Sequence, residues 1–155
     1  MSRLILHQYE LSPFSEKVRR ILAWKQLDWV AVRAPAFMPK PDFVALSGGY
    51  RKVPMLQVGN HLYCDSARIA DYLEQLQPQR TLYPTPLARS LAEWADSALL
   101  ESAMPTILRP TRFDDLSRWF TAAEQQGLLQ DRKQMRQDAL RAGTGPKSLL
   151  AYFSA

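Results

Sequence analysis

Ser12 is the first residue of this sequence whose type and position suggest chemistry. It follows an apolar run at 4–6 and precedes Pro13, after which Val18 and Leu22 recur at helical spacing. Proline suits the first position of a helix, and serine suits the N-cap before it. The first turn of a helix presents free N–H groups and a partial positive charge, which stabilise a thiolate or another anion. Ser12 is therefore either a hydrogen-bond donor to such an anion or an N-cap alone.

Two further segments carry polar groups at the start of a regular element. Lys52 and Val53 precede Pro54, which stands at the start of an apolar strand and cannot donate a ladder hydrogen bond. Asp65 and Ser66 precede a pattern of helical spacing, where they suit the cap. All three candidate segments thus stand where a strand or a helix begins.

The elements that position these segments follow from hydrophobic periodicity. The pattern predicts a strand, helix, strand, short turn, strand, strand and helix, in that order, at 3–8, 13–25, 27–33, 42–46, 53–58, 61–63 and 66–77. A two-residue turn at 59–60 joins the last two strands as a hairpin. The first two strands are joined through a helix, so we expect them to be parallel. The order β-α-β-α-β-β-α predicts a small α/β domain with a mixed four-stranded sheet at 1–78.

After a linker at 79–85 the pattern becomes entirely helical. Leu87, Leu91 and Trp94 recur on one face of a long helix, which we expect to cover a face of the sheet and to be interrupted at Pro105. Two more helices are predicted, one capped at 114 or 115 and one at 129–142. The domains are therefore expected to be an α/β domain at 1–78 and an all-α domain at 86–155.

Composition excludes several classes of function. The chain has 155 residues, of which 46% are hydrophobic, and its net charge of +5 is spread along it without a basic block, so we expect no nucleic-acid partner. A single cysteine, Cys64, excludes an internal disulfide, a CxxC redox pair and a four-cysteine zinc site. No apolar run approaches 18 residues, so we expect no membrane partner. We expect a cytoplasmic protein without a bound metal.

The three segments together resemble those of the soluble glutathione S-transferases. The run 12–19, Ser-Pro-Phe-Ser-Glu-Lys-Val-Arg, is similar to the start of the first helix in the serine classes tau and zeta and the cysteine class omega. The run 51–56 is similar to the stretch around the cis-proline of that family, and Asp65-Ser66 is similar to its γ-glutamyl site. The resemblance implies a thioredoxin-like N-terminal domain followed by a helical domain.

The resemblance also implies a role for each candidate residue. Ser12 would be the catalytic residue and contact the glutathione sulfur, and the backbone of Val53 beside a cis-Pro54 would pair with the cysteinyl backbone. Asp65, which is one methylene shorter than the more usual Glu or Gln, would receive the γ-glutamyl end together with Ser66. Lys52 would pair with the glycyl carboxylate, although a solvated surface charge is an equal alternative. Arg51 or Lys40 for that carboxylate, and Tyr9 in place of Ser12, are further alternatives.

Two functions from different classes remain open. In the first, the protein is a serine-type glutathione transferase that lowers the pKa of the bound thiol, so that a small electrophile reacts with a thiolate. In the second, the same fold is a non-catalytic module for protein interaction or ligand sensing. The all-α domain is shorter than is usual in the family, so some of its apolar side chains are expected to remain exposed. The candidates are Trp119, Phe120, Leu128, Leu129, Leu149, Leu150, Tyr152 and Phe153. We therefore expect a homodimer or a chain derived from a longer parent.

Overall fold

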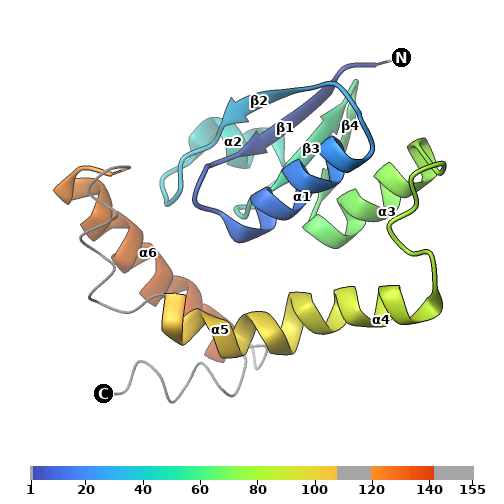
Figure 1. The fold of residues 1–155 in the computed structure, drawn as a ribbon. Coiled ribbons are helices and arrows are strands. Elements are labelled where there is room, and N and C mark those ends of the chain that lie inside the picture. Colours follow the sequence, from blue (N-terminus) through green and yellow to red (C-terminus); the bar gives the residue numbers. More distant parts are fainter. Residues whose placement is uncertain (1, 108–119, 142–155) are drawn as a thin grey trace. The chain divides into compact units, whose positions relative to one another are not determined.

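A computed structural model of the chain describes residues 2–107 and 120–141 (Figure 1). The chain divides into two compact units, Met1–Pro84 and Thr85–Ala155. The first unit contains β1 (Leu4–Gln8), α1 (Pro13–Trp24), β2 (Trp29–Arg33), α2 (Pro41–Leu46), β3 (Met55–Val58), β4 (His61–Cys64) and α3 (Ser66–Leu76). The predicted order of elements is confirmed.

The four strands form one mixed sheet in the order β2-β1-β3-β4. β1 pairs with β2 in parallel, from Leu4 opposite Trp29 to Gln8 opposite Arg33. The β1–β3 and β3–β4 pairs are antiparallel. The thioredoxin-like arrangement with a mixed four-stranded sheet is therefore confirmed for the first unit.

Helices pack on both faces of this sheet, as Figure 1 shows. Because successive strand residues point to opposite faces, Leu4 and Leu6 of β1 join one core cluster, which includes apolar residues of α1 and α3. His7 points the other way, and its ring lies 6.1 Å from that of Phe43 on α2. The sheet is thus covered by α1 and α3 on one face and by α2 on the other.

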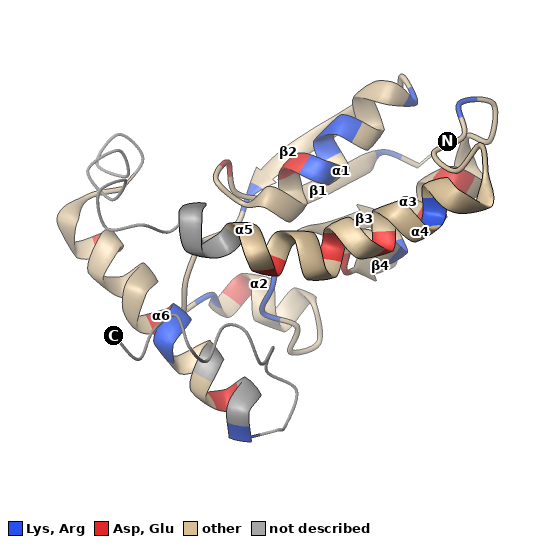
Figure 2. Ribbon diagram, turned by 60° about the horizontal axis from the view of Figure 1, so that its bottom comes forward, with Lys and Arg blue, Asp and Glu red and all other residues tan. Residues whose placement is uncertain are grey.

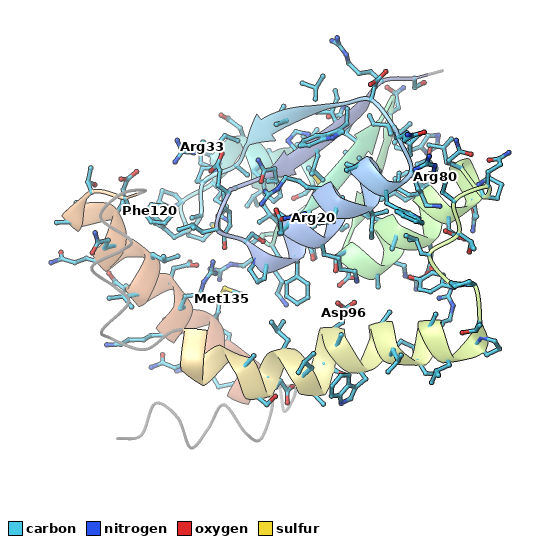
Figure 3. All side chains as sticks on the ribbon, viewed as in Figure 1. Arg20, Arg33, Arg80, Asp96, Phe120 and Met135 are labelled. Atoms are coloured by element: carbon cyan, nitrogen blue, oxygen red, sulfur yellow. The ribbon has the colours of Figure 1, made fainter. Side chains whose placement is uncertain are left out.

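A buried lysine joins the end of α1 to the end of α3. The side chain of Lys25 is 0% exposed, and its Nζ lies 2.7 Å from a carboxylate oxygen of Glu74 on α3. Nζ also donates to the carbonyls of Gln77 at 2.6 Å and Arg80 at 3.0 Å. Arg80, labelled in Figure 3, donates in turn to the carbonyl of Trp24. These bonds therefore hold the segment after α3 against the end of α1.

The second unit begins with one continuous helical stretch. It consists of α4 (Pro86–Trp94), a π-helical segment η1 (Ala95–Leu99) and α5 (Leu100–Ile107). The expected interruption at Pro105 is wrong, because α5 continues to Ile107. Pro105 lies within α5, where its missing N–H removes one ladder hydrogen bond. Side chains on the predicted apolar face of α4 are exposed, by 65% for Leu87 and by 52% for both Leu91 and Trp94.

The last described helix, α6 (Ala122–Arg141), begins earlier than predicted. A reciprocal capping arrangement accounts for the difference: the Thr121 amide donates to the Glu124 carboxylate at 2.8 Å, and the Glu124 amide donates to Thr121 Oγ1 at 3.3 Å. The Thr-x-x-Glu signal was present in the sequence and marks this start. Of the apolar residues among which some are expected to be exposed, Leu129 is 41% exposed, whereas Phe120 just before the helix is 8% exposed. The cap predicted at 114 or 115, Trp119 and the candidates at 149–153 lie outside the described residues.

None of the helices in the described part of the chain has both the length and the apolar character that crossing a bilayer requires.

Candidate functional site

Ser12 is the N-cap of α1, as its position before Pro13 predicts. Its backbone is extended, with φ −76° and ψ 118°, and its Oγ accepts a hydrogen bond from the Ser15 amide at 3.2 Å. The Ser12 amide donates to the Tyr9 carbonyl at 3.2 Å, which closes the turn between β1 and α1. The predicted cap is confirmed, and the hydroxyl is held beside the free N–H groups of the first helical turn.

Because Pro13 fixes the start of the helix and Phe14 is expected to turn inward, the sequence predicts a Ser12 hydroxyl that is exposed to a cleft. This prediction is wrong, because Ser12 is only 3% exposed. The cap hydrogen bond draws Oγ towards the helix, and the turn to Tyr9 folds the preceding backbone against it. A hydroxyl that accepts one hydrogen bond still has its own proton to donate. The Ser12 hydroxyl can therefore donate one hydrogen bond while its oxygen caps the helix.

Ser15, one turn along α1, carries a second buried hydroxyl. It is 0% exposed, and its Oγ has no hydrogen-bond partner within the described ranges. Sequence reasoning assigned it no role, since a serine inside an amphipathic pattern carries no distinguishing signal. It offers a matched comparison for the hydroxyl of Ser12.

The peptide bond between Val53 and Pro54 is cis, as predicted from the sequence. Pro54 is buried, and Val53 packs against the cluster of Phe43 and Met55. The sheet register of β3 begins only at Met55, opposite His7 and Cys64. Val53 therefore lies just before the ladder. A second cis bond, Met38–Pro39, was not predicted.

Asp65 and Ser66 form the start of α3, as predicted. Asp65 is exposed and has a positive φ of 79°, which is uncommon for a residue with a side chain, and its Oδ1 accepts from the Ala67 amide at 2.8 Å. Ser66 is 5% exposed, and its Oγ accepts a hydrogen bond from Lys17 Nζ at 3.5 Å. Lys17 belongs to α1, so this contact brings the starts of the two helices together. Helical spacing alone predicts that Lys17 lies on the solvent-exposed face of α1.

Tyr50 interacts with Asp65 and Cys64, although the sequence analysis assigned it no role. Burial raises the pKa of its phenol to about 12, and the charges of Asp65 and Cys64 add to the rise against an opposing hydrogen bond with the Asp65 backbone. The Tyr50 hydroxyl therefore keeps its proton at neutral pH. Burial, with a further contribution from Asp65, also raises the pKa of the Cys64 thiol, which disfavours its thiolate.

The three candidate cations for a carboxylate differ in their surroundings. Lys40 is 4% exposed and donates to the Arg51 carbonyl at 3.1 Å, with its Nζ 5.7 Å from the centre of the Phe43 ring. Lys52 is exposed, while Arg51 is half-buried. Lys40 thus holds the segment before Val53 in place, and Lys52 presents its charge to solvent. Within the described ranges there is no group of three His, Cys, Asp or Glu residues arranged to hold a metal ion.

Comparison with known proteins agrees with this arrangement. Residues 6–81 match the family model of the glutathione S-transferase N-terminal domain. A probable maleylacetoacetate isomerase from Drosophila melanogaster is 35% identical over 86 residues, which cover 52% of this chain and 35% of that protein.

Solved structures show the same fold. A glutathione S-transferase-like protein from Pseudomonas syringae is 45% identical with a TM-score of 0.64, covering 72% of this chain and 42% of that one. A glutathione S-transferase from Rhodospirillum rubrum is 25% identical with a TM-score of 0.62, covering 86% and 64%. A glutathione transferase homologue from Sulfitobacter, solved with bound glutathione, is 24% identical with a TM-score of 0.56, covering 90% and 68%.

The present chain spans about a third of the Drosophila protein and less than half of the Pseudomonas one. The matched residues 6–81 nevertheless include every candidate residue of the site, from Ser12 at the start of α1 to Ser66 at the start of α3. With their thioredoxin-like sheet, cis-proline and capped helix starts, residues 6–81 belong to the soluble glutathione S-transferase family as its N-terminal domain.

Proposed function

We propose that this protein binds glutathione and activates its thiol for transfer to an electrophilic small molecule. The observation that carries the proposal is the hydrogen bond from Lys17 on α1 to Ser66 on α3. It draws the N-termini of two helices together, and each of them presents free N–H groups and a partial positive charge. A ligand with a thiol at its centre and a carboxylate at its end is suited to such a pair of helix starts.

Each candidate residue has a part in this proposal. Ser12 donates a hydrogen bond from its hydroxyl to the glutathione sulfur. The backbone of Val53, which lies outside the ladder of β3, pairs with the cysteinyl backbone. The exposed carboxylate of Asp65 receives the γ-glutamyl ammonium, and the Ser66 amide receives the γ-glutamyl carboxylate. Lys52 pairs with the glycyl carboxylate at the other end.

The chemistry follows from the stabilised anion. The thiol releases its proton to solvent, the sulfur forms a bond to the electrophilic carbon, and the leaving group departs with the electrons of the bond that breaks. Lowering the thiol pKa from about 8.5 by two units raises the thiolate fraction at neutral pH by more than about tenfold. No metal takes part in the proposed reaction.

The charge of Asp65 provides the test of ligand binding. Asp65→Asn retains an oxygen that caps α3 but loses the charge, so we expect the dissociation constant for glutathione to rise by about tenfold at unchanged stability. Asp28→Asn is the control, because this exposed carboxylate follows the opposite end of α1. Isothermal titration with glutathione measures both variants. Equal affinity of wild type and Asp65→Asn contradicts the assignment of Asp65.

The low exposure of Ser12 favours one alternative, a module that binds glutathione without turnover. A conjugation assay with a generic aromatic electrophile separates the two functions. Binding with measurable conjugation supports the transferase, whereas binding without conjugation supports the module.

We also propose that the protein is a homodimer that buries the apolar face of α4. Leu87, Leu91 and Trp94 are each more than half exposed and recur every three or four residues along that face. Large exposed apolar patches mark sites of association. Sedimentation velocity is expected to show a dimer that Leu91→Glu shifts towards monomer, with Arg89→Glu as the control. A monomeric wild type contradicts the proposal.

A further inference from the structure

Arg19 contacts the loop that leads to Ser12 from two turns further along α1. Its Nη1 donates to the side-chain oxygen of Gln8 at the end of β1, and its Nη2 donates to the carbonyl of Glu10 at 3.0 Å. Its Nε and Nη2 also lie 2.9 and 2.6 Å from the carboxylate of Glu16. One guanidinium therefore joins the strand, the loop and the helix.

The contacts of Arg19 differ in their exposure to solvent. The side chain of Arg19 is 22% exposed and Gln8 is 4% exposed, so the contact between them is shielded from most of the solvent, whereas the bond to the Glu10 carbonyl is exposed. A planar guanidinium offers its donors in a fixed fork, which suits several acceptors at once. Arg33, labelled in Figure 3 at the end of β2, lies 3.8 Å from the Glu10 carboxylate, but both side chains are well exposed and this pair contributes little.

The loop held by Arg19 is the one that determines where Ser12 lies. Only three residues separate Gln8 from Ser12, and the Ser12 amide donates back to the Tyr9 carbonyl. Glu10, whose carbonyl Arg19 holds, lies inside this turn. Figure 2 shows acidic and basic residues next to each other on α1, in agreement with the Arg19–Glu16 pair.

We propose that Arg19 is a positioning residue, which holds the 9–12 loop so that the Ser12 hydroxyl keeps its direction towards the sulfur of bound glutathione. The proposal rests on the proposed function of Ser12. Arg19 acts through the loop, and its own donors are directed at Gln8, Glu10 and Glu16. Loss of Arg19 should therefore impair activation of the thiol more than binding of the tripeptide.

Amide hydrogen exchange tests the structural half without any ligand. In Arg19→Met we expect the Ser12 and Ser15 amides, which close the turn and the cap, to exchange on the order of tenfold faster. The Gln77 amide at the end of α3 serves as an internal reference. Arg20→Met is the matched control, because Arg20 also contacts Glu16 but its side chain is 82% exposed. Unchanged exchange at Ser12 and Ser15 in Arg19→Met overturns the proposal.

Activity and ligand titration test the functional half. We expect Arg19→Met to lower kcat by about tenfold and to raise the pKa of the bound thiol, while the dissociation constant for glutathione stays near the wild-type value. Arg19→Lys should recover little, because a single ammonium cannot reproduce the fork. Equal loss of kcat and affinity overturns the positioning role.

Two further results keep the conclusions separate. If the wild type binds no glutathione, the proposed function fails, while the exchange experiment still decides whether Arg19 holds the loop. If Arg19→Met does not fold, Gln8→Met removes the strand partner of Arg19 instead. Faster exchange at Ser12 in that variant supports the proposal, and wild-type exchange contradicts it.

Discussion

Replacing Ser12 with alanine is expected to lower kcat for thiol transfer by about 100-fold while the dissociation constant for glutathione changes little. The hydroxyl acts on the developing thiolate, whereas the ends of the tripeptide are held by other residues, and removing one donor to a reacting anion costs about 100- to 1,000-fold in kcat. Steady-state kinetics with a generic aromatic electrophile and calorimetric titration with glutathione measure the two quantities. Equal loss of both would count against the assignment of Ser12 to the sulfur.

Two other variants isolate the hydroxyl from the cap. Ser12→Ala also loses the bond from the Ser15 amide, which costs about 1 kcal/mol of stability. Ser12→Thr keeps both a hydroxyl and a cap and should retain most of the activity. Ser15→Ala removes the neighbouring buried hydroxyl, which has no partner among the residues described, and should leave kcat near the wild-type value.

Replacing Lys25 with methionine is expected to lower the free energy of unfolding by about 3 kcal/mol. The change leaves the largely buried carboxylate of Glu74 without its cation and the carbonyls of Gln77 and Arg80 without this donor. Methionine keeps an unbranched apolar stem, so little packing is lost. Urea unfolding followed by circular dichroism measures the difference. Arg20→Met, a loss of the same charge at an exposed site on the same helix, should stay within about 0.5 kcal/mol of wild type.

The contribution of this ion pair should also depend on pH in a defined direction. Burial by itself raises the pKa of Glu74, but hydrogen bonds from Lys25, Thr81 and the Leu82 amide outweigh it and hold the pKa below its ordinary value of 4.5. The unfolded chain therefore takes up a proton more readily than the folded one. The stabilisation is complete above about pH 4.5 and is lost as the pH falls through the lower folded pKa. The stability difference between wild type and Glu74→Gln should accordingly shrink in acid, and a constant difference down to pH 3 contradicts the pairing.

Local signals in the sequence were enough to predict most of the first unit. Pro13 and the serine before it specify the start of α1, because a missing N–H and a side-chain acceptor act within one helical turn. Asp65 predicts the start of α3 for the same reason. Alternation and helical spacing predicted the strands and helices, since each pattern repeats within a few residues. The four-stranded mixed sheet followed because these elements admit few arrangements.

Contacts between distant residues were decided only by the tertiary structure. The Lys17–Ser66 and Lys25–Gln77 bonds join residues 49 and 52 positions apart, and no periodicity in the sequence relates them. The burial of Ser12 depends on how its loop folds against α1. The exposed face of α4 has the same amphipathic pattern as a buried helix, because periodicity shows that a face is apolar but not what covers it. The sequence by itself therefore determined that the candidate residues lie at the starts of helices and strands. The tertiary structure decided which of them are in contact, because burial and charge pairing are properties of the packed chain.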